Sequence, residues 1–333
     1  MARRGVRIGT GLAVLALAAG LWTAGLYRAD MRAIRAELTA QSRVVQTRTG
    51  PVAVAEGGAG RPVLVIHGAG GGFDQGALIA RALGGDGIRW IAPSRFGYPG
   101  AAMPADASPA AQARALADLA DALDLGPVAV MGMSGGAVPA LHFAALFPER
   151  TTALVLLSTA PFAPYGAADQ APPIPVRAYD ALFATDFPFW ALWRVAPGVL
   201  ARMFDAAPAL AARAGPDERA FVAAMVRGFL PVTARTAGLG NEGAAIAPGS
   251  DAALEAITAP TLIIHARDDA LAPRSGAVRA SERIAGATLV ELPDGGHLLL
   301  GHHAALRTRI AEFLAAAPGA VTPAGWPAQR PSP

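Results

Sequence analysis

The sequence predicts an α/β fold in which a doubly wound, mostly parallel sheet carries an inserted helical cap. Short apolar runs, typical of strands covered on both faces, alternate with helix-like segments over residues 62–160. The alternation stops near residue 161 and resumes over residues 261–316, which indicates that the segment between them is an insertion. In addition, one strand leads directly into a helix, and this connection places Ser134 on a sharp turn.

Length and composition limit the architecture and the partners. A chain of 333 residues can bury one large core with an insertion, and 53% apolar against 16% charged residues excludes disorder for most of it. Residues 1–48 carry 8 arginines against two acids, so the remainder, with 20 arginines and 23 acids, has a balance of −3. This distribution argues against a nucleic-acid partner. Without cysteine there is no disulfide, thiolate zinc site or cysteine nucleophile.

The amino end predicts a membrane anchor. Residues 8–27 carry no charge, follow a basic segment with Arg3, Arg4 and Arg7, and as a helix would span about 30 Å, the thickness of a hydrocarbon core. We therefore interpret residues 1–40 as an anchor and linker, with the folded domain periplasmic or otherwise extracytoplasmic. Two alternatives stay open: a signal peptide that is cleaved, which leaves a secreted protein, and a buried first helix of the domain.

Residues 41–160 are predicted to form the first part of the core. The apolar run 62–66 is interpreted as a buried strand, and the glycine-rich segment 67–72 after it lets backbone amides approach a ligand. A helix over about 108–123 begins with Ser108 as its cap and Pro109 in its first turn. Further strands are expected at residues 42–49, 51–56, 88–93, 128–131 and 152–157.

The residues around Ser134 combine a short strand, a tight turn and a helix. A strand that turns directly into a helix forces the residue at the joint into a strained backbone conformation, and the flanking chain leaves no room for side chains. Gly132 and Gly136 satisfy the second demand. The hydroxyl of Ser134 is then expected at the carboxyl edge of the sheet and the amino end of a helix, where developing negative charge is favoured.

Residues 161–250 are interpreted as a helical cap over the same edge of the sheet, because they contain prolines and aromatic clusters but no convincing strand. Residues 251–317 complete the core with strands at 261–265 and 288–292 and a helix near 304–316. The tail 318–333, rich in proline and alanine, is predicted to be disordered.

Two further side chains follow later strands at the same edge of the sheet. A serine hydroxyl needs a base, and the base needs an orienting acid. Asp269 comes soon after one strand and His297 after the last one, in the order Ser, Asp, His. Asp268 is the alternative acid, and the choice of Asp269, four residues before Pro273, follows from the family resemblance described next.

These landmarks resemble the α/β-hydrolase family of the capped esterase, epoxide-hydrolase and C–C-hydrolase type, over about residues 42–317. The resemblance implies that Ser134 is the nucleophile, His297 the base and Asp269 the acid. It implies that the backbone N–H groups of Ala69 and Gly135 form the oxyanion hole, and it implies no metal or organic cofactor. The loop at Ser94-Arg95-Phe96 departs from the family, which usually has an acidic residue before Arg-Gly there.

The nucleophile narrows the predicted activity. Epoxide hydrolases and haloalkane dehalogenases resemble this chain but use an aspartate where it has Ser134, so the resemblance favours a serine hydrolase that cleaves an ester or related acyl bond through an acyl-enzyme. The expected substrates are a small apolar acyl compound and water. C–C bond hydrolysis and thioesterase activity stay open within the same fold, as does a non-catalytic binding module of that fold.

Overall fold

The computed structural model describes residues 2–159, 176–246 and 252–318, and in residues 2–13, 176 and 243–246 it describes the backbone alone. The predicted tail 318–333 therefore lies outside the described residues, except for its first residue. The predicted boundaries of the cap fall in or next to undescribed segments, so they stay predictions.

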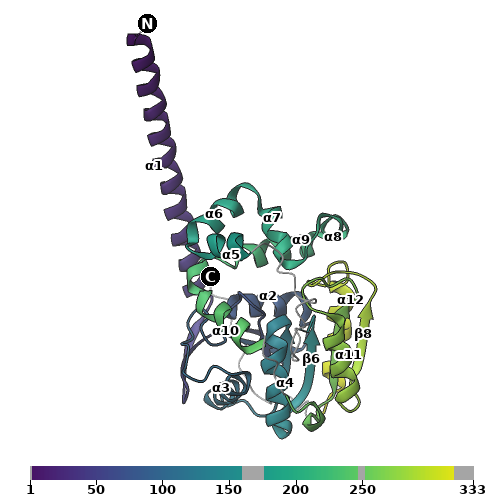
Figure 1. The fold of residues 1–333 in the computed structure, drawn as a ribbon. Coiled ribbons are helices and arrows are strands. Elements are labelled where there is room, and N and C mark those ends of the chain that lie inside the picture. The colour runs from purple at the N-terminus through teal and green to yellow at the C-terminus, as the bar shows by residue number, and fades with distance from the viewer. Residues whose placement is uncertain (1, 160–175, 247–251, 319–333) are drawn as a thin grey trace.

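An eight-stranded sheet forms the centre of the fold, in the order β1-β2-β4-β3-β5-β6-β7-β8 (Figure 1). Strand β2 pairs antiparallel with β1 and with β4, whereas all other neighbours are parallel. The prediction of a doubly wound, mostly parallel sheet is therefore confirmed. The strands are β1 (Arg43–Thr47), β2 (Gly50–Gly58), β3 (Arg61–Ile66), β4 (Ile88–Pro93), β5 (Val128–Met133), β6 (Thr151–Leu157), β7 (Thr261–Ala266) and β8 (Thr288–Leu292).

Alternate residues of the central strands point into two separate hydrophobic cores. On β3, Val63 and Val65 pack with α2 (Phe73–Leu83) and α12 (His303–Ala316) on one face of the sheet. Leu64 and Ile66 pack with three helices on the opposite face, namely α3 (Pro109–Ala122), α4 (Ala137–Leu146) and α11 (Arg274–Arg283). Because both faces are covered, these strands are apolar throughout, as the sequence predicted.

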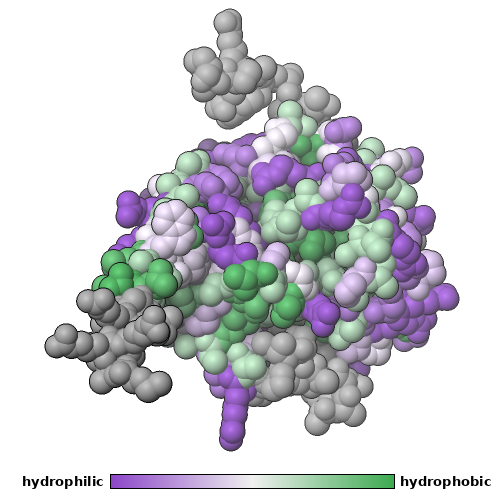
Figure 2. Space-filling view, turned by 90° about the horizontal axis from the view of Figure 1, so that it is seen from above, coloured by the Kyte–Doolittle hydropathy of each residue, from purple (hydrophilic) through white to green (hydrophobic). Residues whose placement is uncertain are grey.

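The helices between β6 and β7 cover the carboxyl edge of the sheet, and the described residues of this insertion contain no strand (Figure 1). Their aromatic side chains, among them Phe183, Phe189 and Phe229, pack against one another. Viewed from the cap side, Figure 2 shows apolar side chains exposed among hydrophilic ones. The cap helices are α5 (Val176–Phe183), α6 (Asp186–Val195), α7 (Pro197–Ala201), α8 (Pro208–Arg213), α9 (Pro216–Arg227) and α10 (Thr236–Ile246).

The amino end forms one long helix, α1 (Ala2–Ala40), whose first half projects from the domain (Figure 1). Its second half packs on the domain, with Met31 and Ile34 buried. Among the described residues, no helix combines the length and the apolar character needed to cross a membrane. The membrane span predicted at residues 8–27 is therefore not supported by the structure, and the side chains of its residues 8–13 lie outside the described ones.

Candidate active site

Ser134 occupies the turn between β5 and α4, where its backbone has φ 53°. This left-handed conformation is costly for a residue with a side chain. The flanking glycines are required by close contacts: a Cβ at Gly132 would lie 2.6 Å from the carbonyl oxygen of Gly136, and a Cβ at Gly136 would lie 2.2 Å from that of Ile66. The predicted strand–turn–helix is present, with a short 3₁₀ turn (Ser134–Gly136) at its centre.

Asp269 and His297 form a hydrogen-bonded pair at the carboxyl ends of β7 and β8. Nδ1 of His297 donates to the two carboxylate oxygens of Asp269 at 3.0 and 2.9 Å. The Asp269 carboxylate also accepts the amide hydrogens of Leu271 and Ala272, at 2.9 and 2.8 Å. The geometry fixes the His297 tautomer in which Nε2 is the free base.

Burial and charge shift the two pKa values of this pair in opposite directions. Burial lowers the pKa of His297, but the Asp269 carboxylate, with a smaller contribution from Asp205, outweighs it, so this pKa lies above the ordinary imidazole value. Burial raises the pKa of Asp269, but the charge and hydrogen bond of His297 outweigh it, so this pKa lies below its usual range. Asp269 is therefore ionised and ready to stabilise an imidazolium.

The neighbouring Asp268 has a different place. Its carboxylate accepts the amide hydrogens of Gly296, at 2.9 Å, and of Gly295, at 3.4 Å, and so supports the loop that carries His297. Of the two candidate acids, Asp269 is the one that contacts the imidazole.

Ser134 and His297 line the same cavity, which has a volume of about 280 Å³. None of the hydrogen bonds of the described residues joins them. Such bonds are often long before a substrate is bound and tighten in the complex. The remaining described lining is mostly apolar and contains no Asp, Glu or Arg: Gly68, Ala69, Gln75, Met133, Gly135, Tyr179, Phe183, Met203, Phe204, Met225, Phe229, Leu239, Leu271 and Leu298.

Most amides of the glycine-rich loop after β3 are already hydrogen-bonded. The amide of Gly68 donates to Gln75 Oε1, that of Gly70 to the Tyr98 hydroxyl and that of Gly71 to the carbonyl of Gly68. Among the described hydrogen bonds, none uses the amide of Ala69. Ala69 and Gly135 both line the cavity, so their amides stay the predicted donors to a negatively charged oxygen.

Side chains behind the glycine-rich loop hold its shape. His67 is fully buried; its Nδ1 donates to the carbonyl of Gly68 at 2.8 Å, and its Nε2 accepts the amide hydrogen of Arg95 at 3.0 Å. Burial keeps the pKa of His67 well below its ordinary value, so the ring is neutral. Arg95 itself donates to the Gly68 carbonyl and to Glu242 of cap helix α10. His67 therefore shapes the loop and does not face the cavity.

The departure from the family pattern after β4 now has an explanation. Ser94, at the position that is usually acidic, accepts the amide hydrogen of Phe73 at 3.0 Å and donates to the carbonyl of Pro99 at 2.7 Å. The counter-ion of Arg95 comes from the cap instead, as Glu242, and Tyr98 donates to the same carboxylate at 2.9 Å.

A second cap residue contacts the glycine-rich loop. Arg235, which has no exposed surface, forms a 2.8 Å ion pair with Asp74 at the start of α2 and donates to the carbonyl of Gly71. Two buried ion pairs, Arg235–Asp74 and Arg95–Glu242, therefore join the segment that returns from the cap to the core. The arginine of each pair also donates to a carbonyl of the glycine-rich loop.

Two contacts of His297 were not predicted from the sequence. Ser158, directly after β6, donates to the carbonyl oxygen of His297 at 2.7 Å. Asp205 of the cap accepts its amide hydrogen at 3.1 Å. The role of Ser158 could have been predicted from its position directly after a central strand, whereas the sequence around Asp205 contains no motif that indicates a contact with His297.

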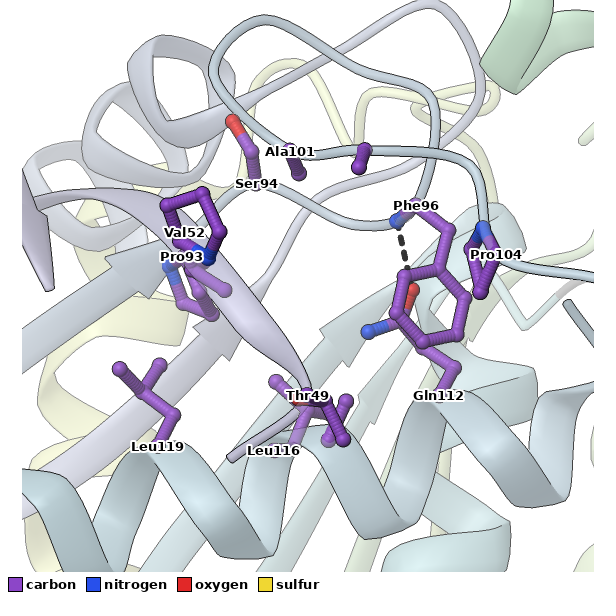
Figure 3. Close-up of a pocket in the computed structure, with 13 residues that line it drawn as sticks. Thr49, Val52, Pro93, Ser94, Phe96, Ala101, Pro104, Gln112, Leu116 and Leu119 are labelled. Atoms are coloured by element: carbon purple, nitrogen blue, oxygen red, sulfur yellow. Dashed lines mark hydrogen bonds between the residues drawn. The ribbon is translucent and has the colours of Figure 1, made fainter. Parts of the chain in front are cut away.

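A small cavity next to the loop after β4 does not resemble a reaction site. It has a volume of about 30 Å³ and lies between the loop after β4 and helix α3, where the amide of Phe96 donates to Gln112 (Figure 3). Its lining includes Val52, Pro93 and Leu116 but no charged residue, so it is a packing gap. Among the described residues, no group of three or more His, Asp or Glu side chains could hold a metal ion.

Comparison with known proteins identifies the family. The family model described as "alpha/beta hydrolase fold" matches residues 61–304. The chain belongs to the α/β-hydrolase family. No curated protein sequence matched this α/β hydrolase.

Solved structures of other α/β hydrolases share its fold. An α/β-hydrolase-fold protein from Nakamurella multipartita is 29% identical, with a TM-score of 0.69 over 82% of this chain and 98% of that one. An esterase from Exiguobacterium antarcticum is 21% identical, with a TM-score of 0.62 over 82% and 99% of the two chains. A meta-cleavage product hydrolase from Pseudomonas fluorescens is 20% identical, with a TM-score of 0.55 over 82% and 97%.

Proposed function

We propose that this α/β hydrolase is a serine hydrolase that cleaves an ester or related acyl bond through an acyl-enzyme intermediate. The observation that carries the proposal is that His297, hydrogen-bonded to Asp269, lines the same cavity as Ser134 and Ala69. Membership of the family supports hydrolytic activity, and the esterase among the similar structures agrees with this class of substrate.

The proposed reaction uses each of these groups in turn. Ser134 Oγ attacks the substrate carbonyl and its proton passes to Nε2 of His297, while Asp269 stabilises the imidazolium. The amides of Ala69 and Gly135 bind the oxyanion of the tetrahedral intermediate. His297 then protonates the leaving group, and an acyl-enzyme remains. A water molecule, deprotonated by His297, attacks the acyl carbon and releases the acid and the free Ser134 hydroxyl.

The cavity favours an uncharged acyl group of small to medium size. Its described lining has no ion to pair with a charged substrate, and its volume of about 280 Å³ is near the lower end for small-molecule sites, about 300 Å³. Phe183, Phe204 and Phe229 supply apolar surface on the cap side of the cavity.

A fluorophosphonate probe tests the nucleophile. The wild-type protein should be labelled covalently, and Ser134→Ala should not. Ser108→Ala, which removes a hydroxyl at the start of α3 that does not line the cavity, is the matched control and should be labelled like the wild type. Labelling that persists in Ser134→Ala, or no labelling of the wild type, would exclude this mechanism and leave the non-catalytic binding module as the interpretation.

Turnover of p-nitrophenyl esters of increasing acyl length tests the substrate class. We expect the highest kcat/KM with short to medium acyl chains and little turnover of dicarboxylic half-esters. Thioester analogues of the best acyl group separate thioesterase from esterase activity.

A C–C bond hydrolase is the second candidate. The similar structure from Pseudomonas fluorescens is a meta-cleavage product hydrolase, and the aromatic cavity could hold an aryl group. This candidate predicts turnover of a vinylogous diketone that exceeds turnover of every simple ester, so assaying both substrates on one preparation decides between them.

Membrane attachment through residues 8–27 is our proposal for the location, with the catalytic domain outside the cytoplasm. The described part of α1 does not meet the requirements for a membrane span, but apolar side chains exposed on its projecting half favour attachment: Val14, Leu15, Leu17, Leu21 and Trp22 are 60–70% exposed. The full chain should then resist carbonate extraction from membranes, whereas a variant with Leu15, Leu17 and Leu21 replaced by Gln should be released. Sequencing the amino end of the mature protein separates an anchor from a cleaved signal.

A further inference from the structure

Asp205 of the cap contacts both loops that carry the candidate catalytic pair. Its Oδ2 atom accepts the amide hydrogen of His297 at 3.1 Å and that of Ala270 at 3.0 Å. Ala270 directly follows Asp269, so one carboxylate oxygen bridges the loop of the acid and the loop of the base. Asp205 follows the short 3₁₀ turn Arg202–Phe204 and has φ 59°, a left-handed conformation that Asp tolerates better than most residues.

The loop before His297 leaves space for this carboxylate. A Cβ at Gly296 would lie 2.8 Å from Asp205 Oδ2 and 3.0 Å from its carbonyl oxygen, and Gly296 itself has φ 58°. Only glycine combines this conformation with so close an approach. The contact therefore depends on two features: the left-handed conformation of Asp205 in the cap and the glycine at position 296 in the core.

The electrostatic surroundings of Asp205 are mainly acidic. Burial raises its pKa, two backbone hydrogen bonds oppose that shift, and the nearby Asp269 carboxylate raises it again. The other titratable groups around His297 are His265, whose Nε2 lies 3.8 Å from Asp269 Oδ2, and Asp268, which binds the Gly296 amide. Burial lowers the pKa of His265, so its ring adds no positive charge.

We propose that Asp205 is a positioning residue for His297, which holds the loops of the acid and the base in place and adds a second negative charge near the imidazole. The proposal rests on the serine-hydrolase function proposed above, in which His297 is the base. Because Asp205 belongs to the cap, its contribution to holding the base depends on this part of the cap being packed on the core, whereas Ser158 and Asp269 hold His297 from the core itself.

Two substitutions separate the hydrogen bonds from the charge. In Asp205→Asn the side-chain oxygen can take the Oδ2 position and keep both hydrogen bonds, to Ala270 and His297. The new NH2 group then replaces Oδ1, which accepts none of the described hydrogen bonds. Asp205→Ala removes both the acceptor and the charge. Asp186→Asn is the matched control. Asp186 is also a buried cap acid, and it accepts two hydrogen bonds from Thr233 and one from Arg35, but none from the loops of Asp269 and His297.

The first measurement is the pH dependence of kcat/KM with a p-nitrophenyl ester. Asp205→Ala should lower kcat/KM by about tenfold to 100-fold, because the base is no longer held in the productive geometry. Asp205→Asn should keep most of kcat/KM at high pH, while the acid limb of its profile moves to lower pH, since the removed charge favoured the imidazolium. Asp186→Asn should leave the profile in place.

The second measurement is an NMR titration of His297 in histidine-labelled protein, assigned by the resonance that His297→Gln removes. In Asp205→Asn the pKa of His297 should fall, and this result would support the proposal even if the wild type hydrolysed no ester. An unchanged pKa together with an unchanged pH profile would overturn it, as would equal changes in Asp186→Asn. If Asp205→Ala does not fold, the Asn variant still decides.

Discussion

Arg95 and Glu242 form a buried ion pair that connects the loop after β4 to cap helix α10, with side chains only 8% and 10% exposed. The same pair reaches the candidate oxyanion hole, because Arg95 donates to the carbonyl of Gly68 and Glu242 accepts from Tyr98. A Cβ at Gly135 would lie 2.7 Å from the Glu242 carboxylate. Cap, glycine-rich loop and serine turn therefore meet at one ion pair.

Removing one member of this ion pair should lower the free energy of unfolding by more than removing both. Glu242→Leu leaves the Arg95 cation buried without a counter-ion and should lower the free energy of unfolding by about 3–5 kcal/mol. The double variant with Arg95→Met should recover part of that loss. Urea unfolding of the four proteins of the double-mutant cycle measures both effects. Equal losses in the single and double variants would contradict the expected coupling.

Activity should rise with pH through a pKa above the ordinary imidazole value. His297 must be neutral to accept the Ser134 proton, and Asp269 and Asp205 hold the pKa of His297 above that value in spite of burial. The protonated, inactive form therefore persists to higher pH than it would for a free imidazole. The acid limb of kcat/KM with a p-nitrophenyl ester reports this pKa. A limb below the ordinary imidazole value would show that the two carboxylates do not act on His297 in solution.

The adjacent aspartates give a matched pair of variants. Asp269→Asn should lower kcat by about 10⁴-fold, because the amide no longer holds the His297 tautomer that leaves Nε2 free. Asp268→Asn keeps an oxygen for the Gly296 amide and should retain most of the activity. Single-substrate kinetics of the two purified variants checks this. The opposite order would make Asp268 the acid.

Phe229 should determine how large an acyl group the cavity accepts. Its ring stacks on Phe189, contacts Phe204 edge-on, and lies against Gly70, where an added Cβ would be 2.0 Å away. Phe229→Ala should move the p-nitrophenyl ester preference to longer or branched chains and reduce the free energy of unfolding by about 3–5 kcal/mol.

Phe221→Ala is the control for this prediction. Phe221 is as buried as Phe229, at 6% against 7% exposure, but it packs on His303 and does not line the cavity. The Phe221→Ala variant should have a lower free energy of unfolding but the same preference for acyl-chain length as the wild type. If both variants changed their preference for acyl-chain length, this preference would depend on the packing of the whole cap and not on Phe229 in particular.

The left-handed backbone of Ser134 should cost the protein stability. Ser134→Gly removes the steric cost of φ 53°, whereas Ser134→Ala keeps it, so the glycine variant should be more stable than the alanine variant by about 1 kcal/mol. Both lack the nucleophile. Thermal unfolding of the two variants measures the difference, and equal stabilities would mean that the turn is not strained.

The parts of the fold that depend on local chemistry were predictable from the sequence. The buried strands follow from short apolar runs, the turn at Ser134 from its two glycines, and α3 from Ser108, which accepts the amide hydrogen of Ala111 as the predicted cap. In each case residues close together in the chain impose the geometry. The Asp269–His297 pair could be predicted because neighbouring parallel strands end at the same edge of a sheet.

The contacts between cap and core could not be predicted in this way. Asp205, Arg235 and Glu242 lie in short helices and turns without a motif, and their partners are 65 to 164 residues away in sequence. Which of these charged side chains is buried depends on how the cap packs, and periodicity does not specify that. The same reason explains why the packing of Met31 and Ile34 of α1 on the domain was not predicted for residues 1–40, which were interpreted as an anchor and linker.

The docking of α1 restricts the opening of this hydrolase. Asp30 accepts a hydrogen bond from Trp190 at 2.8 Å, Arg35 pairs with Asp186 at 3.0 Å, and Glu37 pairs with Arg227 at 2.7 Å, so one helix braces α6 and α9 before the chain enters the sheet. The cap cannot move away from α1 as a rigid unit without breaking all three of these contacts. Reactants and products should therefore pass through a gap opened by individual side chains, and turnover should depend little on solvent viscosity.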